Sequence, residues 1–273
     1  MALTSEKVKA LAAEAGAHGC GIASIDRFGN APEGFSPTDV FSGCKSVCVV
    51  FRTFPHGALL AENLISYTHA AYKMYEEMDR VLMQLSRLLE REGCLAAIIP
   101  PDTPYLYWDE HEMRGQGIIS LKHAAVQAGI GIMGRNTILI HPEYGNMIYL
   151  GALLLDTELE PDPLIKDFGC PENCHHCIDI CPVHAIHDGT VEQKRCRPNS
   201  NFQNERGFDL YACNRCRAEC PLRFGRLGNR ENKPKYFKSA VIADSYKKSL
   251  KDAEERRKKY EAMDKEAMAI DKQ

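Results

Sequence analysis

The chain has 273 residues, of which 44% are hydrophobic, and its formal net charge is −3. This length allows one large domain or two smaller ones with a buried core, and the slight negative charge excludes the strongly basic surface typical of nucleic-acid-binding domains. No apolar run approaches the ~18 residues that a membrane-spanning helix needs, so we expect a soluble, cytoplasmic protein that does not bind a membrane.

Residues 1–160 alternate between predicted helices and predicted strands. Thr4 is expected to cap a helix that continues to Ala15. Residues 61–92 form a long helical pattern with its apolar side chains on one side, and residues 118–128 form a shorter one. Apolar runs typical of buried strands lie at 19–24, 47–51, 95–99, 137–140 and 147–155. This mixture predicts an α/β or mixed α+β layered architecture.

The segment 102–117 is predicted to be a loop rich in aromatic and ionisable side chains. It contains Tyr105, Trp108, Asp109 and Arg114. Loops of this composition are common at substrate sites and also at ordinary interfaces. The composition alone leaves both interpretations open.

Gly129, Gly131 and Gly134 satisfy the spacing GxGxxG. A dinucleotide-binding fingerprint follows a strand and opens a helix. Here a predicted helix leads into the glycines and a predicted strand leads out, so we interpret them as a tight turn. The absence of side chains would let a backbone or a large planar cofactor approach closely.

The pattern Cys-x2-Cys-x3-Cys-Pro occurs twice after residue 160, and a further cysteine precedes each copy. The first group is Cys170, Cys174, Cys177 and Cys181, and the second is Cys196, Cys213, Cys216 and Cys220. Eight cysteines are the ligand count of two 4Fe–4S clusters, each of which is held by four thiolates.

In bacterial ferredoxins the cysteine before the proline binds the other cluster, which predicts crossed ligation. One cluster would take Cys170, Cys174, Cys177 and Cys220, and the other would take Cys181, Cys196, Cys213 and Cys216. Two spacings depart from the ferredoxin pattern. Three residues instead of two separate the first pair of cysteines, and Cys196 lies so far upstream that a loop must fold back to deliver it.

Structural zinc is the main alternative, since it also uses CxxC pairs, although it gives no reason for the repeated proline. Disulfides are the second alternative. The N-terminal sequence is typical of an amphipathic helix and not of a secretory signal peptide, and without an oxidising compartment clustered cysteines favour metal. Low-potential clusters are sensitive to oxygen, so we expect an anaerobic or microaerobic setting.

Five segments together resemble the epoxyqueuosine reductase family, which is related to the reductive dehalogenases. They are residues 43–50, 128–140, 146–156, 177–186 and 211–221, in the family's order. The two cysteine segments alone would fit many proteins, whereas the order of all five is much more specific.

The resemblance implies an α+β fold with three parts. Residues 1–160 would form a nitroreductase-like mixed-sheet domain, 161–230 a bacterial-ferredoxin-like domain with two 4Fe–4S clusters, and 231–273 a charged helical or disordered tail. The first domain would hold cobalamin, which receives electrons from the nearer cluster. The residues that the resemblance assigns to cofactor binding are Lys122, Gly131, Gly134, Arg135 and Asn136.

Two departures from the family limit what the resemblance implies. The position of the family's proton-donating acid falls on Gly115 and Gln116, so no catalytic residue is assigned, and Asp102 and Asp109 are the candidate substitutes. Only the charged tail follows residue 228, where the family has a helical repeat domain associated with tRNA binding. A tRNA substrate is therefore doubtful, and a small-molecule or protein-bound substrate is expected.

The predicted function is a reductase in which two clusters pass low-potential electrons to cobalamin, supplied by a donor such as ferredoxin or flavodoxin. One alternative is a two-cluster electron-transfer protein that serves a separate corrinoid or flavin enzyme. Another is a flavin-dependent reductase on the same scaffold.

Overall fold

The structure is a computed structural model of the chain and describes residues 2–61, 63–227, 251 and 255. The tail predicted at 231–273 lies outside these residues apart from Lys251 and Glu255, so it stays a prediction.

A four-stranded sheet forms the centre of the first 160 residues, with strand order β1-β2-β8-β3. The strands are β1 (Gly19–Ser24), β2 (Ser46–Thr53), β8 (Ile148–Leu155) and β3 (Ala96–Ile99). All neighbouring strands are antiparallel. The predicted α+β class is therefore confirmed, and the α/β alternative with parallel strands is wrong.

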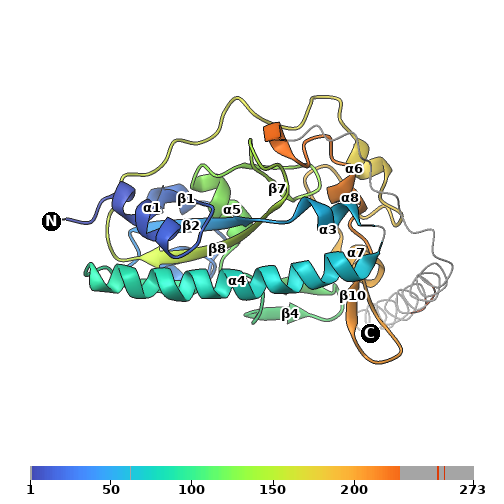
Figure 1. Cartoon of the computed structure of the whole chain (residues 1–273), viewed down its shortest axis with the longest axis horizontal. Helices are drawn as coiled ribbons and strands as arrows, with labels where there is room; N and C mark the ends of the chain where they lie inside the picture. Colours follow the sequence, from blue (N-terminus) through green and yellow to red (C-terminus); the bar gives the residue numbers. More distant parts are fainter. Residues whose placement is uncertain (1, 62, 228–250, 252–254, 256–273) are drawn as a thin grey trace, which may run out of the picture.

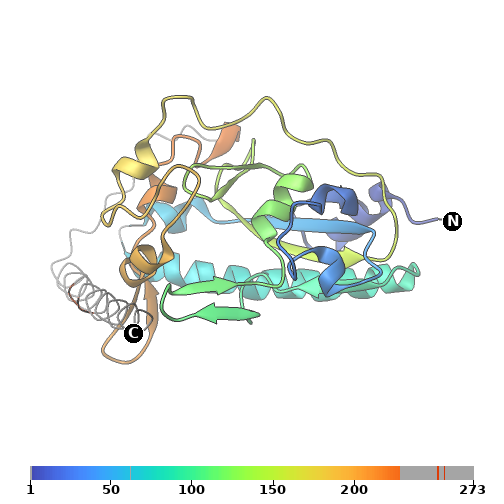
Figure 2. The ribbon, with the colours of Figure 1, turned by 180° about the vertical axis from the view of Figure 1, so that it is seen from behind.

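Helices cover both faces of this sheet (Figures 1 and 2). The long helix α4 (Leu64–Arg91) and α1 (Ser5–Glu14) pack on one face, against side chains such as Cys48 and Val50 of β2. The opposite face, with Val47 and Val49, packs against α5 (Leu121–Gln127). Because successive side chains of a strand point to opposite faces, a continuous apolar run such as β2 is buried on both sides.

Several local predictions are confirmed. The side chain of Thr4 accepts a hydrogen bond from the backbone N–H of Lys7, which caps α1. A helix does precede the GxGxxG glycines and a strand follows them, because α5 leads into the short hairpin of β6 (Ile132–Met133) and β7 (Leu139–Ile140). The segment 102–117 differs from the predicted loop, since β4 (Tyr107–Asp109) pairs with β5 (Arg114–Gln116).

Shorter elements connect these parts. Before α4 they are η1 (Ile25–Phe28), α2 (Pro37–Val40) and α3 (His56–Leu60). After β8 an extended segment runs along the α5 side to the other end of the molecule (Figures 1 and 2). The cysteine-rich region there contains α6 (His176–Asp179), α7 (Gln193–Ser200), β9 (Asn201–Gln203), β10 (Asp209–Tyr211), α8 (Arg215–Ala218) and η2 (Gly225–Leu227).

The cysteine-rich region packs directly on the end of α4. Ala218 and Phe224 share a buried cluster with Phe54 and Met74, and the backbone N–H of Tyr211 donates to Thr68 Oγ1 at 3.1 Å. The two regions therefore share a core. Within the described residues, no helix is both long and apolar enough to cross a bilayer.

Candidate functional site

The eight motif cysteines gather at the end of the sheet in two groups. A hollow between the regions is lined by the first group, together with Arg135 and Asn136. The members of this first cysteine group are Cys170, Cys174, Cys177 and Cys220. These are the four that crossed ligation assigns to one cluster.

The remaining four form the second cysteine group. Their thiols interact electrostatically with one another: Cys216 with Cys213, Cys196 and Cys181, and Cys196 with Cys213 and Cys181. Between Cys196 and Cys213 the chain reverses in the β9–β10 hairpin, where Asn201 pairs with Tyr211. This hairpin is the fold-back that the long separation of Cys196 from Cys213 predicted.

Electrostatics make these groups unfavourable as bare thiolates. Burial, followed by repulsion from the neighbouring cysteines, raises the pKa of Cys216 to about 12. Burial also raises the pKa of Cys220 to about 11. A bound metal reverses this preference, because coordination deprotonates the thiol. Without a metal these cysteines are neutral thiols, and as metal ligands they would be thiolates.

The spacing of the cysteines bears on the kind of centre. Across residues 2–61 and 63–227, no three His, Cys, Asp or Glu side chains converge tightly enough to hold a single metal ion. Four thiolates on one zinc each lie ~2.3 Å from it, whereas the irons and sulfides of a cubane keep its four thiolates farther apart. The structure therefore assigns no metal to either group, and the choice of two clusters over zinc stays a prediction.

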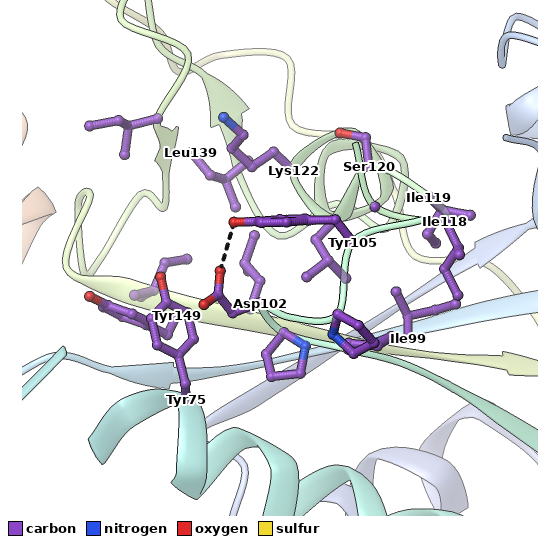
Figure 3. Close-up of a pocket in the computed structure, with 18 of the residues that line it drawn as sticks. Tyr75, Ile99, Asp102, Tyr105, Ile118, Ile119, Ser120, Lys122, Leu139 and Tyr149 are labelled. Carbon is purple, nitrogen blue, oxygen red and sulfur yellow. Dashed lines mark hydrogen bonds between the residues drawn. The ribbon is translucent and has the colours of Figure 1, made fainter. Parts of the chain in front are cut away.

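A pocket of about 430 Å³ lies between the sheet, α4, α5 and α8. Its apolar walls include Ile99 of β3, Leu139 of β7 and Ile148 of β8. Figure 3 shows Ile99 and Leu139 on either side of the ring of Tyr105. The segment between β3 and β4, which contributes Pro101, closes one side. The volume is in the range of small-ligand sites.

Several polar side chains accompany these walls, among them Asp102, Tyr105, Lys122 and Arg217. The Tyr105 hydroxyl donates to Asp102 Oδ1 at 3.3 Å (Figure 3), and Lys122 Nζ donates to the carbonyl of Thr137 at 2.7 Å. Burial lowers the pKa of Lys122, and the positive charge of Arg217 lowers it further. The guanidinium of Arg217 lies 5.6 Å from the centre of the Tyr149 ring.

The structure does not bring the five predicted cofactor-binding residues together. Only Lys122 lines the large pocket. Arg135 and Asn136 lie at the first cysteine group, where Asn136 Nδ2 donates to the carbonyl of Cys216 at 3.1 Å. Gly131 and Gly134 allow the hairpin to close, since a Cβ at Gly131 would lie 2.5 Å from the carbonyl oxygen of Ile140 and one at Gly134 would lie 2.9 Å from its side chain.

The two candidate acids are also separated. Asp102 lines the pocket, whereas Asp109 accepts a hydrogen bond from the backbone N–H of Glu112 in the β4–β5 turn. The sequence interpretation missed Tyr75, Tyr149 and Arg217. Arg217 had a usable signal, because it directly follows a motif cysteine, but the tyrosines come from α4 and β8 and only the fold brings them together.

No family model matches the chain. In sequence it is similar to the epoxyqueuosine reductase of Bacillus anthracis, with 33% identity over 206 residues that cover 70% of the chain and 51% of the relative. The epoxyqueuosine reductase of Bacillus subtilis (strain 168) is 32% identical over 120 residues, covering 40% and 31%. The chain thus spans about half the length of these relatives or less.

Solved structures support the same fold. The structure of the epoxyqueuosine reductase of Streptococcus thermophilus matches with a TM-score of 0.57 at 20% identity. The match covers 82% of the present chain and 68% of the Streptococcus thermophilus chain. The structure of a catabolic reductive dehalogenase matches with a TM-score of 0.59 at 20% identity. This match covers 96% of the present chain and 36% of the dehalogenase chain. One similar epoxyqueuosine reductase was solved with a tRNA stem loop (TM-score 0.54, 20% identity, 84% and 68% covered). The predicted resemblance is confirmed.

Proposed function

Because the chain is related to the epoxyqueuosine reductases, a family of oxidoreductases, we propose that it is an iron–sulfur reductase. Two 4Fe–4S clusters, held by the two cysteine groups, pass low-potential electrons to the pocket. A donor such as ferredoxin or flavodoxin supplies the electrons. The proposed setting is cytoplasmic and anaerobic, because low-potential clusters are sensitive to oxygen.

One observation carries this proposal. Arg217 lines the pocket, and the preceding residue, Cys216, belongs to the second cysteine group. A cluster in that group therefore lies one residue along the chain from the pocket wall. Electrons that reach this cluster have a short route to a bound substrate or cofactor.

The first cysteine group is farther along the proposed route from the pocket. Both groups have partly exposed members, Cys170 and Cys174 in the first and Cys196, Cys213 and Cys216 in the second, so the order of the groups rests on the place of Cys216 beside the pocket wall. Cys177 of the first group and Cys181 of the second are four residues apart, which limits their Cα separation to ~14 Å. The proposed sequence is donor, first group, second group, pocket.

Cobalamin is the electron acceptor that the resemblance implies, and it is proposed on that ground alone. A whole corrinoid is larger than the pocket of about 430 Å³, and of the five predicted contact residues only Lys122 faces this space. The residues present do not fit the complete group, so we assign no reaction step to it. Asp102, inside the pocket, is the better placed of the two candidate proton donors.

The pocket supports a small-molecule or protein-bound group as the substrate. Its volume suits a small ligand, and the net charge of −3 offers no general attraction for polyanions. One structural neighbour was solved with a tRNA stem loop, so the doubt about tRNA for this chain stays a prediction.

Metal and cofactor analysis tests the proposal. We expect about eight iron atoms per chain in protein expressed and purified without oxygen in the presence of cobalamin. One cobalt per chain would support the corrinoid reductase. Eight iron atoms without cobalt or flavin would favour the alternative, a two-cluster electron-transfer protein, and a yellow fluorophore released on denaturation would identify flavin. Zinc in place of iron would contradict the cluster assignment.

Crossed ligation has a separate test. Cys177→Ala and Cys213→Ala should each abolish the electron paramagnetic resonance signal of a different cluster, because the two residues lie in different groups. Each change should also destabilise the protein, since metal binding contributes to folding. Cys44→Ala is the matched control, because this buried thiol lies on the sheet and both signals should remain. Loss of the same signal in both ligand variants would show that the ligation is not crossed.

A further inference from the structure

Two basic side chains that are far apart in the sequence line the same pocket. Lys122 comes from α5 and Arg217 from α8. They are close enough that the charge of Arg217 contributes to the lowered pKa of Lys122. Two cations that repel each other in a partly buried space cost free energy unless an anion lies near them.

The pocket itself supplies little negative charge. Asp102 is the one acidic residue among the described residues that line it, and it accepts a hydrogen bond from Tyr105 (Figure 3). Among the described residues, neither Lys122 nor Arg217 forms an ion pair with Asp102, and Lys122 donates a hydrogen bond to the backbone carbonyl of Thr137. An ammonium group has three donors, so Lys122 can serve a ligand as well.

Arg217 provides an independent sign of a missing partner. Its Nη1 is fully buried and has no hydrogen-bond acceptor within the described part of the chain. A buried donor without an acceptor costs about 1–3 kcal/mol, and more when it is charged. A guanidinium pairs best with a planar oxyanion such as a carboxylate, because its N–H groups form a matching fork.

The remaining walls determine what the anion is attached to. They are largely aliphatic and aromatic, with Ile119, Leu139 and Tyr149 among them. A free phosphate or a nucleotide would leave this surface uncovered, whereas an apolar carbon skeleton would bury it favourably. The space of about 430 Å³ suits a ligand much smaller than a corrinoid.

We propose that this pocket binds a small organic carboxylate, with its carboxylate group between Lys122 and Arg217 and its apolar body against the aliphatic walls. This assigns a substrate class to the site of the proposed reductase, and it rests on the proposed function only for the claim that the pocket is where reduction occurs. The binding itself depends on the two cations and the walls.

Calorimetry on the anaerobically purified holoprotein tests the proposal. The probes are benzoate and hexanoate, each compared with its neutral amide, benzamide or hexanamide. Both acids should bind, and each amide should bind at least about tenfold more weakly, because the charge-assisted hydrogen bonds are lost. Equal affinity for acid and amide, or no binding of either acid, would overturn the proposal.

Variants locate the binding site. Lys122→Gln should weaken benzoate binding about tenfold or more. Lys73→Gln is the matched control, because Lys73 pairs with Glu76 on the exposed side of α4 and does not line the pocket, so affinity should be unchanged. Arg217→Gln should also weaken binding, in protein whose iron content equals that of the wild type. If Lys122→Gln binds benzoate as the wild type does, the carboxylate site is not here.

Different results would refute the carboxylate site and the iron–sulfur reductase. Protein that lacks iron but binds benzoate through Lys122 would refute the reductase and leave the carboxylate site standing. Protein with eight iron atoms that does not distinguish acid from amide would refute the carboxylate site alone.

Discussion

His141 is a half-buried side chain whose charge state is affected by its surroundings. Its Nδ1 accepts hydrogen bonds from the backbone N–H groups of Glu143 and Tyr144, at 3.0 and 3.3 Å. Its ring lies 4.9 Å from that of Phe51 and 5.0 Å from that of Tyr144, between centroids. Protonation would turn the accepting nitrogen into a donor, and burial lowers the pKa of His141 below its ordinary value.

This environment predicts a pH dependence of stability. The folded state keeps His141 neutral to a lower pH than the unfolded chain, which takes up a proton near the ordinary pKa of about 6.5. The contribution to the free energy of unfolding is therefore complete above that pH and decreases as the pH falls below it, by at most about 1.4 kcal/mol per pH unit. His141→Asn should reduce the slope between pH 7 and pH 5, measured by urea unfolding without oxygen.

The change to asparagine keeps a side-chain acceptor near the same turn while removing the titrating group. Some slope should remain, because burial also lowers the pKa of His18. Identical slopes in the wild type and in His141→Asn would contradict the role assigned to this residue.

At the level of residues, spacing in the sequence addresses only the cysteine groups. The repeated motif predicts which cysteines share a centre, and the structure places these cysteines in two groups of four, whereas their role as ligands stays a prediction. The pocket residues Tyr75 and Tyr149 carried no such signal. Each looks like an ordinary core aromatic in its own helix or strand, and only the packing of α4 against β8 brings them together.

At the level of elements, the segment after β8 explains the glycine turn. Gly129 has φ +68°, and a Cβ there would lie 2.3 Å from the carbonyl oxygen of Pro163. The neighbouring Asp162 is fixed to β1, because its N–H donates to the carbonyl of Ile22 and its carboxylate accepts the N–H of Ile22. The close approach expected at this turn is made by the backbone of the chain itself.

Gly129→Ala should therefore destabilise the protein. A left-handed backbone conformation costs an alanine about 1–2 kcal/mol, and displacing residue 163 from β1 adds to this, so we expect a loss of about 2 kcal/mol or more in the free energy of unfolding. The matched control is Gly57→Ala in α3, where a Cβ meets no atom within 4 Å and stability should be unchanged or slightly raised. An equal effect of the two changes in denaturant unfolding would argue against this contact.

Strand positions were predictable because buried strands have continuous apolar runs, and β1 begins and ends at the predicted residues. Strand order and direction could not be predicted in the same way. They depend on pairing between distant parts of the chain, such as that of Val49 with Gly21 and Ala152. The β4–β5 hairpin was missed for a similar reason. Its side chains, including Tyr107 and Trp108, are partly exposed and show no alternation that would predict a strand.

At the level of the whole molecule, two asparagines tie the sheet region to the second cysteine motif. Asn146 Nδ2 donates to the carbonyl of Arg217 at 3.0 Å, and Asn136 Nδ2 donates to the carbonyl of Cys216 at 3.1 Å. Both asparagines are buried, so these bonds are shielded from water. The geometry of the second cysteine group therefore depends on the sheet region. We expect the rate at which the proposed cluster loses iron to depend on these contacts, which lie outside the cysteine motifs.

Asn136→Ala should loosen this attachment. The change leaves the carbonyl of Cys216 without this donor, at a cost of about 1–3 kcal/mol, and removes the acceptor for the N–H of Ile138. Iron should consequently be lost faster to an added chelator, followed by the decay of cluster absorbance without oxygen. Asn204→Ala is the matched control: Asn204 also accepts two backbone N–H groups, from Arg206 and Phe208, but within the β9–β10 turn. Equal rates of iron loss in both variants would mean that the sheet region does not hold the cluster in place, and the two regions would then act as independent units.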